Sequence, residues 1–377
     1  MNARAAVAQL PQLPQLPQLT SLRFFATFWV LGFHALPRAG PLDAWAAFWN
    51  LGWMGVTFFF VLSGFILTYT YGRADKPFAL RQFWVARFAR VYPLYIFALL
   101  FAVPQLMHDV RQAGASVDPI DAHRLAGVVV SSVAMLQAWF GQFVCVWNCP
   151  SWSLSDEAFF YALFPLLVPL VASRYGRGVI LAVAVCGMAL VALGATGAAV
   201  PSLAIPAVEA TLNPLGRLPE FLFGCWLGGV FLAHGPSWRA ASPIAVTTAL
   251  TVISLSIWAG FHTTFKVPHL VAAPLFGLLI FAVAASRSPS RGILAAAPLV
   301  LLGEASYALY MLHGPLHGYT LAAFNRAAPS VPNGIRFVVY VVAALALAIS
   351  SYRWLEHPMR VWIRARLGTS VRPPVPR

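Results

Sequence analysis

The sequence has little charge. Only 10% of its 377 residues are Asp, Glu, Lys or Arg, whereas a soluble domain carries about a quarter. Apolar residues make up 60%, so an ordinary water-soluble enzyme is excluded and the composition predicts an all-α polytopic membrane protein. Acidic residues number 11 against 25 Lys and Arg, giving a net charge of +14. The basic residues stand between apolar runs, where they orient spans in the bilayer. No separate basic domain exists, so nucleic acid is not an expected partner.

Cysteine is also scarce, with four residues in the chain. Cys145 and Cys149 flank the loop VWN without the spacing or the histidines of a zinc site, so no metal is expected. Cys186 and Cys225 lie inside apolar runs and resemble small hydrophobic residues. In the span arrangement predicted below, the first two cysteines face the oxidising side. A disulfide and two free thiols are equally compatible with the sequence.

The first residues lack an uninterrupted apolar core, so no cleavable signal sequence is expected. Repeated Gln-Leu-Pro triplets from Gln9 to Pro17 favour an extended, poorly ordered segment. We therefore expect a disordered tail over residues 1–21, a membrane domain over 22–360 and a basic tail over 361–377. We place both tails in the cytoplasm.

Long apolar runs dominate the rest of the chain. A helix crosses the hydrocarbon core with about 20 mainly apolar residues. Candidate runs cover residues 22–37, 51–71, 91–107, 125–140, 157–173, 178–198, 219–234, 243–261, 268–286, 303–325 and 336–354.

The distribution of positive charge indicates how many of these runs cross, because cytoplasmic loops retain Lys and Arg. If every run except 125–140 crosses, most of the 25 positive residues lie on the cytoplasmic side. If run 125–140 also crossed, the basic end from Arg353 to Arg377 would be exported. The sequence therefore predicts about ten transmembrane helices with cytoplasmic N- and C-termini. Residues 108–156 would form an external excursion containing an apolar helix.

Ionisable groups inside apolar spans are costly and therefore point to function. Arg23 and His34 are eleven residues apart in the first span, which is about 16 Å along a helix and on one face of it. Arg23 alone could be a positive-inside anchor, and His34 could be a hydrogen-bonded packing residue. Glu157 begins a later span on the same expected side as His34. Its carboxylate could orient the imidazole or stabilise its charge.

The residues around Glu157 also have a simpler interpretation. In the stretch PSWSLSDEAFF, Ser153 or Ser155 could cap the helix while Asp156 and Glu157 meet its positive N-terminal end. That interpretation does not account for Trp152. We therefore keep the residues of this stretch as candidates for a site.

Two further stretches carry polar side chains at helical spacing. Arg87 and Arg90 are three residues apart, so they are either an anion clamp for a phosphorylated ligand or part of a charged cytoplasmic loop. Glu304 begins a polar stripe that continues at Tyr307, Tyr310 and His313 and can line a pocket.

The stretch YRWLEHPMR is interpreted differently. Glu356 lies at a predicted helix end that Pro358 terminates. We expect this glutamate to be structural. No phosphate-binding glycine loop, serine-nucleophile elbow or metal-ligand cluster is found in the sequence.

These stretches, in this order, resemble the acyltransferase-3 family of integral membrane acyltransferases. The resemblance extends from about residue 21 to residue 360. It rests on Arg23 with ten residues before His34, on FFFVLSGF at 58–65, on Arg87 with Arg90, on WSLSDE at 152–157 and on SYALYMLH at 306–313.

The resemblance implies an O-acyltransferase, usually an O-acetyltransferase, in the bacterial cytoplasmic (inner) membrane. Its donor would be cytoplasmic acetyl-CoA or another acyl-CoA, with no bound cofactor. Its acceptor would be a hydroxyl of a cell-surface polysaccharide, such as an exopolysaccharide or lipopolysaccharide, or of a lipid-linked sugar precursor. Partners could include the polysaccharide-biosynthesis machinery as well as the lipid bilayer.

The resemblance also assigns roles to residues. His34 would be the essential catalytic residue and Glu157 its support, while Arg23, Arg87 and Arg90 would hold the donor. Pocket or supporting roles go to Trp152, Ser153, Ser155, Tyr307, Tyr310 and His313.

The sequence departs from the family at two points. His357 occupies a position where the family usually has Arg or Lys, so it is given no ligand. Many relatives carry a soluble hydrolase-like domain after the spans. This sequence ends about twenty residues after its last predicted span, so we expect an acceptor that does not need such a domain.

Two other functions remain open from the residues alone. In a polytopic transporter or flippase, His34, Glu157 and Glu304 would relay protons and the arginines would bind an anionic solute. A structural subunit of a polysaccharide export complex would keep its function without His34.

Overall fold

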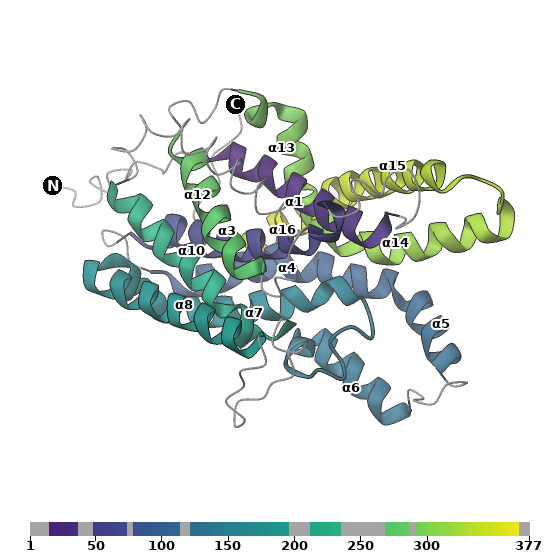
Figure 1. Cartoon of the computed structure of the whole chain (residues 1–377), viewed down its shortest axis with the longest axis horizontal. Helices are drawn as coiled ribbons and strands as arrows, with labels where there is room; N and C mark the ends of the chain where they lie inside the picture. Colours follow the sequence, from purple (N-terminus) through teal and green to yellow (C-terminus); the bar gives the residue numbers. More distant parts are fainter. Residues whose placement is uncertain are drawn as a thin grey trace.

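The structure is a computed structural model that describes residues 15–36, 48–73, 78–113, 121–195, 212–234, 268–286 and 292–368. Within these ranges the chain forms helices and no strands (Figure 1), which confirms the predicted all-α class. The helices are α1 (Pro17–Ala35), α3 (Gly55–Tyr71), α4 (Leu80–Phe101), α5 (Val103–Ala113), α6 (Ala122–Val133), α7 (Trp152–Ala172), α8 (Arg174–Ala195), α10 (Pro214–His234), α12 (Pro268–Ala284), α13 (Ala297–Glu304), α14 (Ser306–Ala327), α15 (Asn333–Ser351) and α16 (His357–Leu367). Short helical turns lie at Gly52–Met54, Gln137–Trp139, Cys149–Ser151, Ile293–Ala295 and Tyr352–Glu356.

Helix α3 lies at the centre of the bundle, against α1, α7, α10 and α12. Helix α14 packs on α1 and α4, and it forms a long hairpin with α15 that projects from the body in Figure 1. Helix α16 returns to pack against α4. This arrangement brings together the helices that carry the candidate residues, namely α1, α4, α7 and α14.

Glycines allow the central helices to approach closely. A Cβ atom added at Gly64 of α3 would lie 2.2 Å from the carbonyl oxygen of Phe221 on α10. A Cβ atom at Gly224 of α10 would lie 2.1 Å from the carbonyl oxygen of Val61. Only glycine fits at either position, as is typical of helix pairs that associate in a membrane through small residues.

Six helical segments of the described residues are long and apolar enough to cross a membrane: Phe48–Tyr71, Leu80–Phe101, Cys149–Ala172, Arg174–Ala192, Pro214–His234 and Asn333–Leu367. They support a multi-pass membrane protein. The predicted span at 243–261 lies outside the described residues. Helix α6, which covers part of run 125–140, is shorter than these six segments.

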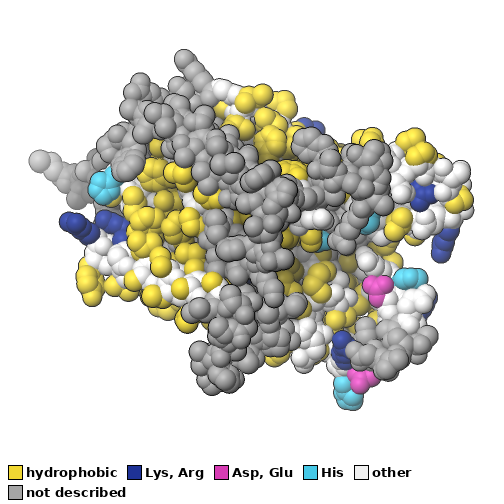
Figure 2. Space-filling view, viewed as in Figure 1, with side chains coloured by type: hydrophobic (Ala, Val, Ile, Leu, Met, Phe, Trp, Pro, Cys, Tyr) yellow, Lys and Arg dark blue, Asp and Glu magenta, His cyan; other side chains and the backbone are white. Residues whose placement is uncertain are grey.

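The outer face of the bundle is apolar. Hydrophobic side chains gather over α8 and α10 in Figure 2, and the described Lys and Arg side chains lie mostly at the margins of this view. On α15, Ile335, Val338 and Val342 are 55%, 60% and 62% exposed. Such a surface is unfavourable in water, whereas lipid chains cover it at no such cost.

Several helices start earlier than predicted: α7 begins at Trp152 and α10 at Pro214, five residues before the predicted runs, and α1 and α4 also start early. Helix α1 begins at Pro17 instead of residue 22, because proline is well suited to the first turn of a helix and Leu19 is buried against the core. Helix α4 begins at Leu80 instead of residue 91. The arginines of its first half interrupt the hydropathy signal without interrupting the helix. Arg87 and Arg90 are therefore helical residues, and the alternative of a charged loop is wrong.

The predicted stop at Pro358 is also wrong. The chain stays helical from α15 through a π-helical turn at Tyr352–Glu356 into α16. Pro358 falls in the first turn of α16, where its missing N–H is tolerated. Because the intervening turn is π-helical, the first turn of α16 does not continue the hydrogen-bond pattern of α15.

Candidate active site

A cavity of about 150 Å³ lies inside the bundle, between α1, α3, α4, α7 and α14. The polar residues that line it are Arg23, Ser63, Arg87, Arg90, Ser153, Glu157, Tyr161, Ser306, Tyr307 and Tyr310. The sequence predicted seven of these as site residues, and they come from four separate stretches: Arg23, Arg87, Arg90, Ser153, Glu157, Tyr307 and Tyr310. The structure thus assembles most of the candidates around a single space.

Arg87 has an incompletely satisfied guanidinium group. The centre of the group lies 5.7 to 6.0 Å from the rings of Tyr71, Phe83 and Tyr161, so cation–π contacts hold it in place. Its Nε is buried without a hydrogen-bond partner among the described residues. A buried donor of this kind is costly unless a ligand completes it.

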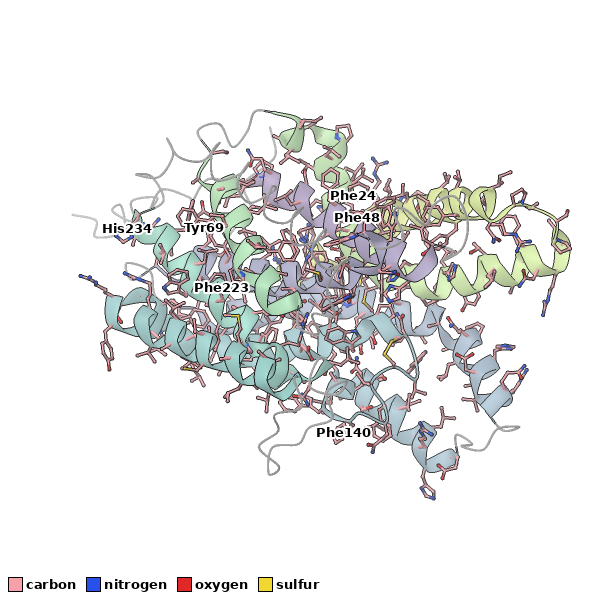
Figure 3. All side chains as sticks on the ribbon, in the orientation of Figure 1. Phe24, Phe48, Tyr69, Phe140, Phe223 and His234 are labelled. Carbon is pink, nitrogen blue, oxygen red and sulfur yellow. A yellow bond between two sulfur atoms is a disulfide. The ribbon has the colours of Figure 1, made fainter. Side chains whose placement is uncertain are left out.

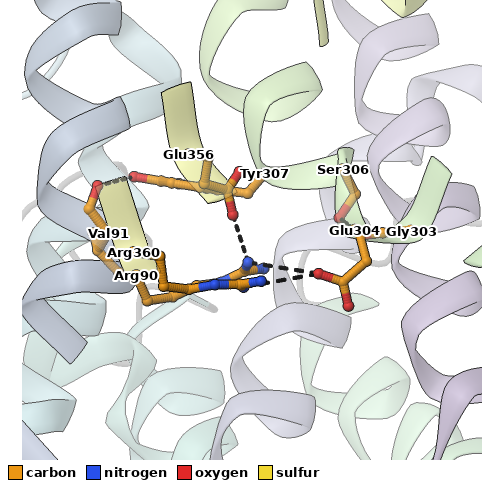
Figure 4. A network of polar contacts seen from close by, with 8 residues as sticks. All are labelled: Arg90, Val91, Gly303, Glu304, Ser306, Tyr307, Glu356 and Arg360. Atoms are coloured by element: carbon orange, nitrogen blue, oxygen red, sulfur yellow. Dashed lines mark hydrogen bonds and ion pairs between the residues drawn. The ribbon is translucent and has the colours of Figure 1, made fainter. Parts of the chain in front are cut away.

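Arg90, in contrast, is already paired. Figure 4 shows its Nη1 between two carboxylates, 2.5 Å from Oε1 of Glu356 and 3.9 Å from Oε2 of Glu304. Arg360 reaches the same Glu304 oxygen at 3.8 Å. Glu356 is only 1% exposed, so this ion pair joins α4 to the turn before α16. Part of the charge of Arg90 is therefore neutralised by the protein.

Glu157 lies on the α7 wall of the cavity. Ser63 of α3 donates a hydrogen bond to its Oε1 at 3.1 Å, and Tyr161, one turn later on α7, donates to the same oxygen. These bonds fix the carboxylate in the cavity. Its partners are therefore a serine and a tyrosine, and it makes no direct hydrogen bond to His34.

Two tyrosines and a serine close the cavity on the α14 side. The hydroxyls of Tyr310 and Ser153 lie 2.9 Å apart, and Tyr307 donates to the carbonyl oxygen of Val91 at 2.8 Å. The predicted stripe of Glu304, Tyr307, Tyr310 and His313 is interrupted, because α13 ends at Glu304 and α14 begins at Ser306. Glu304 lies instead beside Arg90 and Arg360, at 3.9 and 3.8 Å.

His34 does not line the cavity and is connected to it through His313. Its Nδ1 lies 3.0 Å from the carbonyl oxygen of Val30 and 3.1 Å from Nε2 of His313. Nδ1 of His313 is in turn 2.7 Å from the carbonyl oxygen of Tyr310. The His34 side chain is exposed, whereas His313 is 1% exposed. The buried imidazole thus connects the exposed one to a residue of the cavity.

These contacts determine which nitrogen of each neutral imidazole ring carries the proton. A carbonyl oxygen only accepts, so His313 carries its proton on Nδ1 and presents the lone pair of Nε2 to His34. His34 then donates from Nδ1, and its own Nε2 keeps a free lone pair. An imidazole in this tautomer can remove a proton from a substrate.

Besides His34 and His313, two predicted site residues do not line the cavity. Trp152 packs on Phe60, with ring centroids 6.2 Å apart, and on the guanidinium of Arg217 at 5.8 Å. Ser155 is buried and accepts a hydrogen bond from the backbone N–H of Ala138 at 3.3 Å. Both therefore support α7 instead of contacting the cavity.

The capping interpretation of this stretch is wrong as well. Helix α7 already begins at Trp152 and has no side-chain cap at Ser151. Asp156 is fully buried, and neither of its carboxylate oxygens has a hydrogen-bond partner among the described residues.

Several polar residues of the site were missed by sequence reasoning. Ser63 lies in the stretch FFFVLSGF, which the resemblance included without giving the serine a role, and Tyr161 is an ordinary residue of an apolar run. Glu356 was interpreted as structural, and its ion pair with Arg90 agrees with that interpretation. The pair Arg217–Glu220 on α10, with Nη1 and Oε1 2.9 Å apart, was also missed. Its spacing of three residues inside an apolar run was a usable signal, because ionisable groups in a span need partners.

Cys145 and Cys149 form a disulfide in the loop before α7, drawn as a yellow bond between sulfur atoms in Figure 3. Of the two interpretations that the sequence left open, the structure has the bridged one. Cys186 is exposed and Cys225 is buried, and both are free thiols.

Comparison with known proteins gives a consistent result. The sequence model of a family described as an acyltransferase domain (acyltransferase 3) matches residues 16–353. Acyltransferase MdmB of Streptomyces mycarofaciens is 29% identical over 322 residues, which cover 78% of this chain and 77% of that protein. No solved structure matches the chain.

Two further relatives are O-acetyltransferases by name. Peptidoglycan O-acetyltransferase OatA of Listeria monocytogenes is 23% identical over 342 residues, which cover 82% of this chain and 51% of the relative. O-acetyltransferase OatA of Staphylococcus aureus is 24% identical over 339 residues, covering 82% of this chain and 53% of the relative. The chain spans about half the length of both OatA proteins.

Proposed function

Because this chain belongs to the acyltransferase-3 family and is an O-acyltransferase, we propose that it transfers an acetyl or other short acyl group from cytoplasmic acyl-CoA. The acceptor is a hydroxyl of a cell-surface polysaccharide or of its lipid-linked sugar precursor. The observation that carries this proposal is the cavity between α1, α3, α4, α7 and α14. Three arginines line the cavity, and the hydrogen-bonded His34–His313 pair adjoins its wall.

The arginines suit the donor. Coenzyme A is a polyanion, and guanidinium groups bind phosphate oxygens through paired hydrogen bonds. Arg87 offers a donor that no described residue satisfies, whereas Arg90 is paired with Glu356. We therefore assign the donor phosphate contact mainly to Arg87, with Arg23 beside it in the cavity. Arg90 shapes the site and contributes a charge that Glu356 partly offsets.

Replacing Arg87 by glutamine is expected to raise the KM for acetyl-CoA about 10- to 100-fold, because a hydrogen bond to a charged group contributes about 1.5–3 kcal/mol. The acceptor KM should change by much less. Initial rates of purified protein in vesicles measure both constants. Arg81→Gln is the matched control, since Arg81 lies on the same helix, is exposed and does not line the cavity. Equal donor constants for the two variants would contradict the assignment.

The histidine pair supplies the chemistry. In one route, Nε2 of His34 takes the proton of the acceptor hydroxyl while that oxygen attacks the thioester carbon. The carbon–sulfur bond breaks, the coenzyme leaves as thiolate, and His34 returns the proton to the sulfur. In a second route, Nε2 of His34 itself attacks the thioester carbon, the carbon–sulfur bond breaks and the coenzyme leaves as thiolate. The acceptor oxygen then attacks the acyl carbon, the bond to Nε2 breaks, and the hydroxyl proton passes to the thiolate. In both routes His313 positions His34 by accepting from its Nδ1.

The proposed topology is the one that the charges favour. Ten helices cross the bacterial inner membrane, with both termini in the cytoplasm. Arg23, Arg87, Arg90 and Arg360 then lie toward the cytoplasmic side, where acyl-CoA is present. His34, near the opposite end of α1, lies toward the outer side.

The test of the whole proposal is the ester content of surface polysaccharide from the producing bacterium. Proton NMR of wild-type, deletion and complemented strains is expected to show acyl signals that disappear on deletion and return with the wild-type copy. The same spectra identify the acylated sugar. A deletion strain that keeps all its esters while losing uptake or export of a solute would contradict acyl transfer and favour a transporter.

A further inference from the structure

A second cavity, of about 70 Å³, lies between α14 and α15. It is lined by Ala35, His317, Thr320, Leu321, Phe324, Asn333, Arg336, Phe337 and Tyr340. We refer to it as the hairpin cleft. Its α14 residues 317, 320, 321 and 324 share one helical face, and so do its α15 residues 333, 336, 337 and 340. The hairpin cleft is therefore built by two facing helix surfaces.

The hairpin cleft adjoins the His34–His313 pair. Ala35, which follows His34 at the end of α1, lines it directly. His317 lies one turn after His313 on α14, and its ring packs on that of Tyr340 with centroids 5.2 Å apart. The hydroxyl of Tyr340 donates to the carbonyl oxygen of His313 at 3.0 Å. Two lining residues of the cleft thus flank the buried member of the pair.

The histidine pair lies between this cleft and the first cavity, which Arg23, Arg87 and Arg90 line and which we call the arginine-lined cavity. On one side, His313 is hydrogen-bonded through Nδ1 to Tyr310, whose side chain lines the arginine-lined cavity. On the other side, its carbonyl oxygen accepts from Tyr340 of the hairpin cleft. Neither His34 nor His313 lines either cavity, and their chain neighbours Ala35 and His317 line the hairpin cleft. Two substrates could therefore approach the imidazoles from different sides.

The lining of the hairpin cleft suits a neutral, hydroxyl-rich group. Arg336 uses four of its five N–H groups on Asn325 and on the carbonyl oxygens of Val331, Ala328 and Pro329, which leaves one N–H of Nη1 to donate to a hydroxyl. The ring nitrogens of His317 make no hydrogen bond with the described residues.

Apolar surface completes the lining. The aromatic rings of Phe324, Phe337 and Tyr340 provide flat faces. A few hydrogen-bonding groups set among aromatic side chains are typical of small-molecule sites. They match a sugar, which has both apolar faces and hydroxyls.

We propose that the hairpin cleft binds the acceptor sugar and presents one of its hydroxyls to Nε2 of His34. This inference rests on the proposed function. It assigns the acceptor to the side of the histidine pair that the arginines do not occupy. His34 would take the proton of the sugar hydroxyl, and the acyl group would reach the sugar oxygen from the side of the arginine-lined cavity.

The proposal is tested by filling the cleft with a larger side chain. Leu321 lines it and is 44% exposed, so Leu321→Trp places an indole in the space that the sugar would occupy. The control is Val342→Trp: Val342 is 62% exposed and lies nine residues after Asn333, about half a turn around α15 from the cleft. Membranes of the deletion strain supply the natural acceptor, and [14C]acetyl-CoA supplies the label.

Leu321→Trp is expected to lower label incorporation into polysaccharide at least tenfold, whereas calorimetry should give a Kd for acetyl-CoA within twofold of the wild-type value. Val342→Trp should change neither quantity, and the smaller change His317→Ala should raise the acceptor KM without altering acetyl-CoA binding. Unchanged incorporation with Leu321→Trp and His317→Ala would overturn the acceptor assignment. Loss of acetyl-CoA binding in both variants would overturn it too. A wild-type protein that neither binds acetyl-CoA nor incorporates label would instead refute the proposed function.

Discussion

Alanine in place of His34 is expected to reduce acyl transfer by about 10²- to 10⁴-fold, the range that a positioned general base contributes. If His34 is the group that becomes acylated, the loss should be at least as large. The rate of label transfer from [14C]acetyl-CoA to polysaccharide measures the effect. His108→Ala is the control, because His108 is exposed on α5 and lines neither cavity. A His34→Ala protein that restores normal ester content would refute the mechanism.

The partner of His34 can be tested in the same assay. His313→Leu removes one of the two acceptors near the His34 Nδ1–H and leaves only the carbonyl oxygen of Val30. The imidazole is then held less firmly, so kcat should fall while the KM for acetyl-CoA changes little. His313→Gln keeps a side-chain oxygen that can accept this bond and an amide that can donate to Tyr310. It should recover part of the lost kcat. If glutamine and leucine reduce kcat equally, His313 acts through packing and does not position His34.

The second large effect concerns stability. Glu220→Leu is expected to destabilise the protein by about 3–5 kcal/mol, because it removes the carboxylate that forms an ion pair with a buried arginine. Arg217 and Glu220 are 2% and 1% exposed, with Nη1 and Oε1 2.9 Å apart. Thr57 of α3 donates to the glutamate and accepts from Arg217. This cluster joins α10 to α3, the helix that positions Ser63 against Glu157.

Thermal unfolding of the detergent-purified protein measures this loss. The double variant Arg217→Met with Glu220→Leu should recover most of it, since a matched apolar pair can replace a buried ion pair. Arg174→Met serves as control because Arg174 is exposed, and it should change stability by less than about 0.5 kcal/mol. A double variant as unstable as the single one would show that the cluster contributes more than compensation of charge.

Much of the candidate site could be read from local spacing. Arg23 and His34 lie on one helix, and Arg23, Arg87 and Arg90 line a common cavity with Glu157, Tyr307 and Tyr310. The charged residues stood out because a charge inside an apolar span costs free energy and is therefore a sign of function. The same logic missed Ser63 and Tyr161. A hydroxyl is tolerated in an apolar helix and gives no such signal.

The partners of these residues could not be read from the sequence. Glu157 was expected to support His34, yet its hydrogen bonds come from Ser63 and Tyr161. The imidazole beside His34 belongs to His313, 279 residues away, and the carboxylate beside Arg90 belongs to Glu356, 266 residues away. Spacing along a helix determines which face carries a side chain. It does not determine which helix packs against that face.

The amino-acid sequence by itself determined the helical class, the apolar outer surface and the helix faces that carry ionisable groups, because hydropathy and helical periodicity act within a few residues of each other. The tertiary structure decided that α14 brings His313 to His34, that the turn before α16 brings Glu356 to Arg90, and that the hairpin of α14 and α15 makes a second cavity beside the histidines. These contacts join residues far apart in the chain. They depend on how whole helices pack, through close approaches such as the one at Gly64 and Gly224, and no local pattern encodes that packing.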